Sequence, residues 1–172
     1  VMSMVGVILL SGSLNLRKIV EAQGNWFWEW NFVPQIIGFV VFVIAAVSEL
    51  NRTPFDLPEA ESELVAGYHV EYSGFRFAFF MLAEYVYTFA IAALTTVLFL
   101  GGWHAPFPFL DFIPGILWFL IKMSICVFFM FWLRATLPRV RVDQLMGIGW
   151  KVLLPLALVN IFLTAIVKEL LR

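Results

Sequence analysis

The stretch "FRFAFFMLAEYVYTFAIAALTTVLFL", residues 75–100, decides the fold of this chain, because only two of its residues carry a charge. A membrane-spanning helix needs about 20 mostly apolar residues, and this stretch is long enough to be one. Pro114–Leu133 and Gly149–Val167 meet the same condition, and Phe32–Val47 falls slightly short of it. Met2–Leu10 has the composition of the tail of another helix. The sequence therefore predicts an all-α integral membrane protein with four complete transmembrane helices and part of a fifth.

The composition of the whole chain requires lipid as its main solvent. Of 172 residues, 62% are hydrophobic and 13% are charged, whereas soluble domains are about half apolar and about a quarter charged. A domain of this size leaves too much surface to hide that excess in a core. We therefore expect one polytopic membrane domain over residues 1–172, surrounded by lipid. Because Val1 opens an apolar run already under way, we expect this chain to be a piece of a longer subunit.

The same inventory argues against several other classes of protein. The net charge of −1 gives no sign of a nucleic-acid partner, and the single cysteine, Cys126, excludes an internal disulfide. His69 and His104 lie in different loops, without the spacing of a metal site. The sequence has no phosphate loop, dinucleotide fingerprint or nucleophile elbow. We therefore expect no metal or redox centre in this chain, and no enzyme that acts alone.

The orientation of the helices follows from the lysines and arginines in the short loops. The basic loop, residues 134–149, carries Arg134, Arg139 and Arg141, and Lys151 follows two residues after it. We expect this loop to face the cytoplasm, or the matrix in a mitochondrial protein. Residues 49–74 precede it by two spans and so lie on the same side. The turn "GGWHAPFPFLDF", residues 101–112, and the loop with Trp26, Trp28 and Trp30 lie on the opposite side.

Two charged residues, Glu84 and Lys122, lie deep inside predicted spans, well away from their ends. A charge at the centre of a membrane helix costs about 2.5–3.5 kcal/mol on insertion scales and often marks an ion or proton path. For Glu84 this interpretation is favoured over a structural carboxyl bonded to Tyr85 or Tyr87. For Lys122, which has no evident partner in the sequence, a proton relay and a simple staple between helices remain equally open.

The long loop at residues 49–74 is rich in acids: Asp56, Glu59, Glu61, Glu63 and Glu71. Thr53 and Pro54 resemble a helix start, and a short helix is expected from Pro58 to about Ala66. On that helix Glu59 and Glu63 would share a face. Glu49 and Arg52 are close enough in sequence to pair. Spacing alone leaves a solvated acidic loop and a proton site equally open.

These residues resemble one protein family closely. The stretches are "ELNRTPFDLPEAESELVAGYHVEYSGFRFAFFMLAEY" (49–85), "LRATLPRVRVDQLMGIGWK" (133–151), "LFLGGW" (98–103) and "GSLNLRKIVEAQ" (12–23). They are similar to the family formed by the H subunit (also numbered subunit 1) of NADH:quinone oxidoreductase, respiratory complex I. The resemblance covers essentially the whole chain and corresponds to about the C-terminal half of the family's length.

The resemblance implies a membrane subunit whose acidic loop helps form the quinone-binding chamber and a path of coupled acids leading from it. By matching position, the proton-path residues are Glu49, Asp56, Glu59, Glu61, Glu63, Glu71 and Glu84. Arg52 is their implied ion-pair partner. Phe55, Arg134 and Arg139 are implied to lie on the chamber side, although packing suits Phe55 better. Quinone reduction would shift the proton affinities of the acids, whose pKa values depend on one another.

The resemblance also implies partners and a location. This chain would bind no cofactor, with quinone as substrate and NADH, FMN and iron–sulfur clusters in partner subunits. The partners would be the iron–sulfur subunits of the hydrophilic arm together with small and antiporter-like membrane subunits. The expected location is the bacterial plasma (inner) membrane, with the mitochondrial inner membrane as the alternative.

Two other functions remain as alternatives. Membrane-bound hydrogenases, including formate hydrogenlyase, use a related subunit in a similar place. A stand-alone secondary transporter would use Glu84 and Lys122 as substrate or ion residues. Transporters of that class often contain internal repeats, and the spans of this sequence show none.

Overall fold

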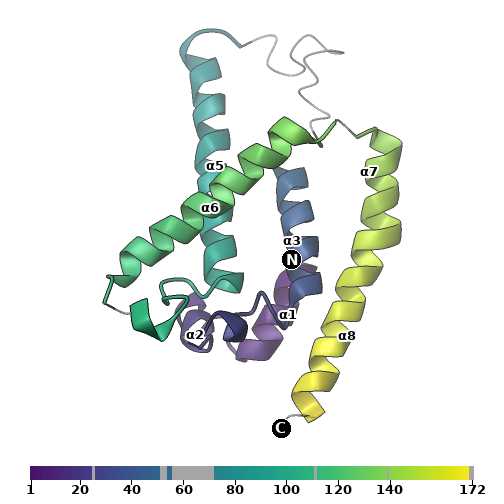
Figure 1. Ribbon diagram of the computed structural model, residues 1–172. Helices are drawn as coiled ribbons and strands as arrows, with labels where there is room; N and C mark the ends of the chain where they lie inside the picture. The colour runs from purple at the N-terminus through teal and green to yellow at the C-terminus, as the bar shows by residue number, and fades with distance from the viewer. Residues whose placement is uncertain (25, 51–53, 56–71, 111, 139, 171–172) are drawn as a thin grey trace.

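The computed structural model describes residues 1–24, 26–50, 54–55, 72–110, 112–138 and 140–170. Within these ranges the chain forms helices and connecting turns, with no strand (Figure 1). The main helices are α1 (Met2–Ser11), α2 (Leu16–Glu21), α3 (Ile36–Glu49), α5 (Phe75–Phe99), α6 (Gly115–Thr136), α7 (Val142–Ile148) and α8 (Leu154–Leu170). Shorter helical turns are η1 (Phe27–Glu29), η3 (Pro108–Leu110) and η4 (Gly149–Leu153).

Three helical segments are long and apolar enough to cross a membrane: Phe75–Phe99, Gly115–Thr136 and Val142–Leu170. These correspond to three of the predicted spans, and the all-helical membrane architecture is confirmed. The fourth predicted span, α3, has 14 residues, which is shorter than the roughly 20 that a perpendicular crossing requires. The number of complete spans stays a prediction.

Two helix boundaries differ from the prediction because of prolines. Pro34 fixes its own backbone and has no N–H to donate, and α3 begins at Ile36 instead of Phe32. The last span extends back through α7, and the wider turn η4 separates α7 from α8. Pro155 lies just beyond η4 and cannot donate to the carbonyl four residues earlier, so a widened turn accommodates it.

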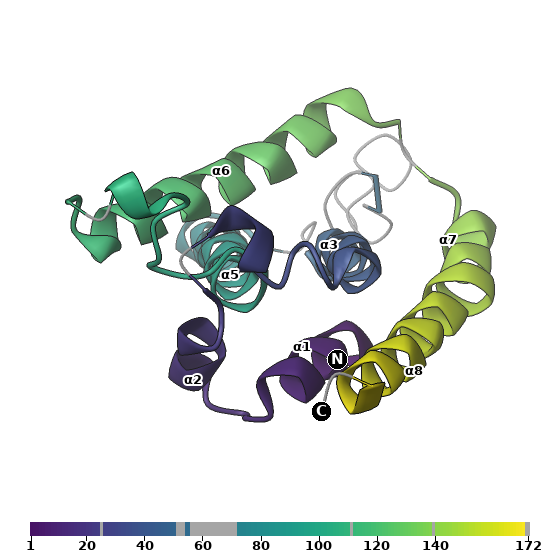
Figure 2. The same ribbon diagram turned by 60° about the horizontal axis from the view of Figure 1, so that its bottom comes forward.

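Helix α3 lies in the middle of the molecule, with the other long helices around it (Figure 2). Its aromatic side chains interlock with the last turn of α5. The ring centroids of Phe39 and Phe99 are 5.3 Å apart, and those of Phe42 and Phe99 are 5.4 Å apart. Aromatic pairs at such distances contribute beyond their buried area. This cluster fixes α3 against α5.

Helices α1, α3 and α8 meet through small and polar residues. The Gln35 Oε1 atom accepts a hydrogen bond from Asn160 Nδ2 at 2.6 Å, and Gln35 Nε2 donates to Thr164 at 2.5 Å. A Cβ on Gly6 would lie 2.4 Å from Gln35 Oε1, and one on Gly38 would lie 2.9 Å from Asn160 Nδ2. Small residues that allow close approach and polar side chains that bond across helices are typical of packing inside membranes.

The connecting segments gather at two ends of the bundle. At the end that we call the basic end, α3 and α6 finish while α5 and α7 begin (Figure 1). There the Val140 N–H donates to the Pro54 carbonyl at 2.9 Å. At the other end, the tryptophan end, the Phe27 N–H donates to the Pro106 carbonyl at 3.2 Å. These two contacts join described residues of the loops that were expected on common sides, and the sides themselves stay a prediction.

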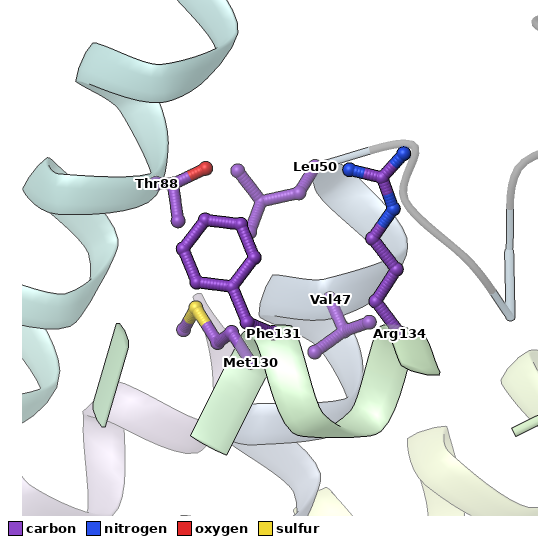
Figure 3. A pocket seen from close by; sticks show the side chains of 6 residues that line it. All are labelled: Val47, Leu50, Thr88, Met130, Phe131 and Arg134. Atoms are coloured by element: carbon purple, nitrogen blue, oxygen red, sulfur yellow. The ribbon is translucent and has the colours of Figure 1, made fainter. Parts of the chain in front are cut away.

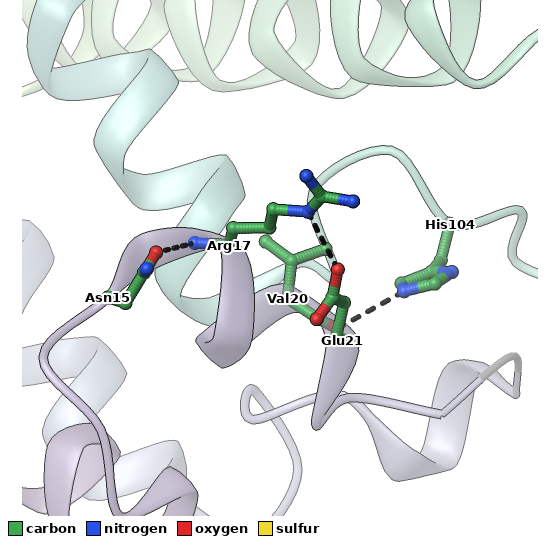
Figure 4. A network of polar contacts seen from close by, with 5 residues as sticks. All are labelled: Asn15, Arg17, Val20, Glu21 and His104. Atoms are coloured by element: carbon green, nitrogen blue, oxygen red, sulfur yellow. Dashed lines mark hydrogen bonds and ion pairs between the residues drawn. The ribbon is translucent and has the colours of Figure 1, made fainter.

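A small polar network holds α2 at the tryptophan end (Figure 4). The Asn15 side chain accepts from the Arg17 N–H at 3.0 Å and so caps the helix. Arg17 and Glu21, one turn apart, form an exposed ion pair at 2.8 Å. The His104 Nε2 atom is 3.1 Å from the Val20 carbonyl and donates to it. The loop after α5 is thereby tied to α2.

Candidate functional site

The main candidate site is a cleft of about 500 Å³ between α1, α3 and α5, here called the α1–α3–α5 cleft. Most of its lining is apolar, with Phe42, Ile91 and Leu94 among the lining residues. Its polar groups include the carboxylate of Glu49 and the hydroxyl of Tyr87. A mostly apolar cleft with a few convergent polar groups is the usual form of a functional site.

The position of Glu49 explains why it needs a donor. Glu49 is the last residue of α3, and the C-terminus of a helix carries partial negative charge that disfavours a carboxylate. Tyr87, on α5, lines the same cleft and carries a hydroxyl, which is a hydrogen-bond donor. Glu84 precedes Tyr87 by three residues, so the two lie on neighbouring positions of one helix face. Of the predicted proton-path residues, Glu49 therefore lies at the basic end of α3, and Glu84 lies in the basic half of α5.

Arg134 borders a second, much smaller cavity between α3, α5 and α6 (Figure 3). The cavity has a volume of about 10 Å³, which is space for about one water molecule. Val47 and Leu50 line it from α3, and Thr88 lines it from α5. The Arg134 side chain extends along the end of α3 toward the basic end. This places Arg134 among the residues that surround the last turn of α3.

Phe55 lies on the other side of that last turn. Its side chain is only 8% exposed, and it lines an apolar groove between α3 and α6. Val47 lines both this groove and the small cavity beside Arg134. The interpretation of Phe55 as a packing residue therefore agrees with its surroundings.

The remaining predicted site residues at the acidic and basic loops lie outside the described residues. They are Arg52, Asp56, Glu59, Glu61, Glu63, Glu71 and Arg139. The expected short helix from Pro58 to Ala66 lies in the same part of the chain. The arrangement of these residues, and the pairing of Glu49 with Arg52, stay predictions.

Lys122 lies far from these acids, at the tryptophan end of α5. Its side chain is 6% exposed, and its ammonium donates to the carbonyls of Leu100, Gly102 and His104 at 2.6, 3.2 and 2.7 Å. The ammonium also lies 3.8 Å from the centre of the Trp30 ring, a cation–π contact. The sequence left two interpretations of Lys122 open. These contacts favour a structural link between helices, because each one joins α6 to the residues that follow α5 or to the residue that follows η1.

Several polar residues at structurally important positions were missed by the sequence reasoning. Tyr87 was considered only as a partner of Glu84. Gln23 and the Gln35–Asn160 pair received no role at all. The available signal was an amide side chain next to or within an apolar run, since such a group needs a hydrogen-bond partner in a membrane. Which partner it finds cannot be read from one segment.

No group of three or more His, Cys, Asp or Glu side chains suited to a metal ion occurs among the described residues. Cys126, with its sulfur 4.0 Å from the Thr96 hydroxyl, lies between α5 and α6. The described part of the site is therefore a set of carboxyl and hydroxyl groups, whose chemistry is hydrogen bonding and proton exchange.

Comparison with known proteins identifies the family. A family model described as NADH dehydrogenase matches residues 1–165. A protein of Anoxybacillus flavithermus, named as the H subunit of NADH-quinone oxidoreductase, is 74% identical over 99% of this chain and 50% of its own length. A protein of the same name from Brevibacillus brevis is 70% identical over 97% of this chain and 49% of its own length. The chain spans about half the length of these curated relatives. Because the family match covers nearly all of it, the chain belongs to the NADH dehydrogenase family.

Proposed function

We propose that the chain forms part of the membrane subunit of a proton-pumping NADH:quinone oxidoreductase. In that complex it borders the quinone chamber and carries part of an acidic path that couples quinone reduction to proton translocation. The presence of Glu49 and Tyr87 together in the lining of the α1–α3–α5 cleft is the observation that carries this proposal. The names of the two relatives support the same assignment.

The proposed path begins with groups whose chemistry suits proton exchange. A tyrosine hydroxyl both donates and accepts hydrogen bonds, so Tyr87 is suited to link Glu49 to the face of α5 that carries Glu84. Carboxyl groups that interact strongly titrate together, so a charge change at one alters the proton affinity of the next. We propose that the path continues through the acids outside the described residues: Asp56, Glu59, Glu61, Glu63 and Glu71, with Arg52 as their ion-pair partner.

The proposed chamber lies at the basic end. Phe55 and Arg134 flank the last turn of α3 there, and Arg139 follows in the basic loop. Quinone reduction consumes electrons and protons in equal numbers, with the electrons arriving from an iron–sulfur cluster in a partner subunit. The charge that changes in the chamber would act first on the nearest carboxyl groups. No redox step is assigned to the side chains of this chain.

The same proposal gives the setting of the protein. NADH, FMN and the iron–sulfur clusters would be held by partners in the hydrophilic arm, and the small and antiporter-like membrane subunits would complete the membrane arm. We place the protein in the bacterial plasma membrane with its basic end toward the cytoplasm, because cytoplasmic loops carry the excess of Lys and Arg. Both relatives are bacterial proteins.

The direct test neutralises one carboxylate at a time in the full-length subunit. Glu49→Gln and Glu84→Gln keep side-chain volume but remove the proton-carrying group. We expect NADH oxidation by quinone, and the proton pumping linked to it, to fall by about tenfold or more, within the range of proton-transfer groups. NADH oxidation by a small water-soluble acceptor in the same membranes should be unchanged, because it reports assembled partner subunits. Glu169→Gln, in the last turn of α8, is the matched control.

The acids outside the described residues are tested in the same way with Glu61→Gln and Glu63→Gln. Normal quinone-linked oxidation and pumping in all four variants would reject the proton path. Hydrogen evolution by these membranes, with no quinone-linked NADH oxidation, would instead indicate the hydrogenase alternative.

A further inference from the structure

The α1–α3–α5 cleft has one exposed end and one buried end. Glu49 and Tyr87 line the first end and are exposed, with 40% of Tyr87 accessible. Phe42 and Ile91 line the other end and are buried. Because α3 runs toward the basic end and α5 runs away from it (Figure 1), Phe42 and Ile91 both lie on the tryptophan side of the polar pair. The cleft therefore ends in buried side chains on the side of the tryptophan end.

Behind this buried end lies a closely packed group of apolar side chains. Phe42 and Ile91 belong to one buried cluster with Val7 of α1 and Phe99 of α5, and these four residues are here called the apolar layer. Val7 and Phe99 have no exposed surface at all. The Phe99 ring packs against those of Phe39 and Phe42, with centroids 5.3 and 5.4 Å apart. Interiors packed in this way have few voids large enough for water, and purely apolar voids stay dry.

Beyond the apolar layer, two buried amides spend their hydrogen bonds within this chain. Asn31 Nδ2 donates to the Leu98 carbonyl at 2.9 Å, and Gln23 Nε2 donates to the Val97 carbonyl at 3.0 Å. The Gln23 Oε1 atom accepts from the N–H groups of Asn31 and Gly101. A side-chain amide is a neutral hydrogen-bonding group with no carboxyl proton to exchange. These amides hold the end of α5 and do not continue the set of carboxyl groups past the layer.

We propose that the apolar layer is a proton seal, so that protons reach Glu49 and Tyr87 only from the exposed end of the α1–α3–α5 cleft. A charge inside a membrane is costly unless water or a polar partner accompanies it, and the layer supplies neither. A protein that carries protons within a membrane needs such a barrier, because a continuous path between the two sides would dissipate the gradient.

The inference rests on the proposed function, because it concerns the protons that Glu49 exchanges there. It adds a direction to that function. The space between α1, α3 and α5 exchanges protons at its exposed end, and it does not form a channel that crosses the membrane. Protons that are translocated must therefore leave by a route other than this cleft.

The first test measures from which side water reaches the cleft. Ala90→Cys places a thiol in the cleft lining at an exposed position, in a full-length subunit without other reactive cysteines. The assembled complex, in sealed vesicles of both orientations, is treated with a charged methanethiosulfonate that does not cross membranes. We expect labelling only when the reagent is on the side of the basic end. Val142→Cys, at the start of α7, and Phe109→Cys, in η3, are exposed and calibrate the two sides.

The second test opens the layer. Phe99→Ser and Phe42→Ser each make room for water and supply a hydroxyl to hold it. With neither NADH nor quinone present, a pH gradient is imposed across vesicles that contain the assembled complex. We expect the passive proton leak to rise several-fold above that of the native complex. Phe109→Ser, at an exposed position of η3, is the matched control and should leave the leak unchanged. NADH oxidation by a water-soluble acceptor confirms that each variant has assembled.

Three results would overturn the seal. They are labelling of Ala90→Cys from the tryptophan side, no labelling from the basic side, and a native leak in assembled Phe42→Ser and Phe99→Ser. Each is separable from failure of the proposed function. One-sided labelling with normal pumping in Glu49→Gln would keep the barrier and reject the proton path. Labelling from both sides with loss of pumping in Glu49→Gln would keep the path and reject the seal.

Discussion

The two ends of α5 are held in different ways, although the helix is apolar along its whole length. At the tryptophan end, Gln23 donates to the carbonyls of Val97 and Leu98, and Lys122 binds the carbonyl of Leu100. At the basic end, large side chains such as Phe75 and Phe79 are exposed. One end is enclosed by polar contacts within this chain, and the other presents apolar surface to its surroundings.

This difference follows from which backbone groups at each end of α5 lack a hydrogen-bond partner within the helix. The last carbonyls of a helix have no partner within the helix, and no lipid group can replace one. The buried end of α5 therefore needs donors from elsewhere in the chain. Beyond its first turn, the exposed half needs only an apolar environment, because its backbone groups are paired within the helix. The comparison predicts that replacing a polar residue by an apolar one reduces stability most at the tryptophan end. The same kind of replacement should affect function most at the basic end.

The largest loss of stability is expected from Lys122→Met at the tryptophan end. The variant leaves the three carbonyls that follow the end of α5, those of Leu100, Gly102 and His104, without their charged donor. Hydrogen bonds to charged groups are stronger than those between neutral groups. We expect the free energy of unfolding to fall by about 3 kcal/mol or more. The measurement is the thermal stability of the full-length subunit in mild detergent, together with its amount in the membrane.

Lys151→Met is the matched control for Lys122→Met, because Lys151, in η4, is exposed. Its effect should stay within about 0.5 kcal/mol, as for most surface substitutions. Equal stability of the two variants would show that the ammonium of Lys122 does not hold the end of α5. Reduced quinone-linked activity in a fully stable Lys122→Met variant would restore the proton-relay interpretation.

The next largest loss is expected from Gln23→Leu. The Gln23 amide donates to Ile19 and Val97 and accepts from the Gly101 N–H at 2.9 Å. A leucine of similar size leaves these groups unpaired, and one buried unsatisfied group costs about 1–3 kcal/mol. The total should be near 2–3 kcal/mol, because part of the structure relaxes. Gln144→Leu, on exposed α7, should have little effect in the same thermal assay, and a larger effect there than at Gln23 would contradict the comparison.

The sequence predicted the long helices well because their signal is local. Residues 75–100 and 114–133 need only length and hydropathy to be recognised, and α5 and α6 agree with them to within a few residues. The start of α3 was less accurate because Pro34 acts on the backbone, which a count of apolar residues does not register. The basic loop was recognised by its charge, while the helical turns of α7 within it were not.

The contacts that fix the helix ends were not predictable for a different reason. Lys122 binds backbone carbonyls, and every residue has one, so no pattern of side chains marks its partners. Gln23 meets Leu98 across 75 positions of sequence. The meeting of Glu49 and Tyr87 in one cleft likewise depends on how α3 lies against α5. Sequence identified the polar residues that need partners, and packing determined which partners they have.

A smaller effect is expected from Asn160→Leu in the contact between α3 and α8. The variant removes the 2.6 Å hydrogen bond to Gln35, and such bonds between membrane helices are worth about 0.6–2 kcal/mol. A double-mutant cycle with Gln35→Leu isolates the pair, because residues that share a bond do not act additively. Additive losses in the thermal assay would show that the two amides do not stabilise one another.

The smallest effect on stability, and the sharpest test of the comparison, is expected from Tyr87→Phe, at the middle of α5 and facing the end of α3 across the cleft. The ring remains, and only the hydroxyl, which shares the α1–α3–α5 cleft with Glu49, is lost. Because Glu49 is exposed, its carboxylate can bond to water in place of the tyrosine, and the free energy of unfolding should fall by less than about 1 kcal/mol.

Tyr72→Phe, just before α5, is the control for loss of a hydroxyl. If Tyr87 links the acids, quinone-linked NADH oxidation should fall in Tyr87→Phe and not in Tyr72→Phe, with both variants equally stable. A large loss of stability with normal activity would instead make Tyr87 a structural residue, and the two ends of α5 would then be held alike.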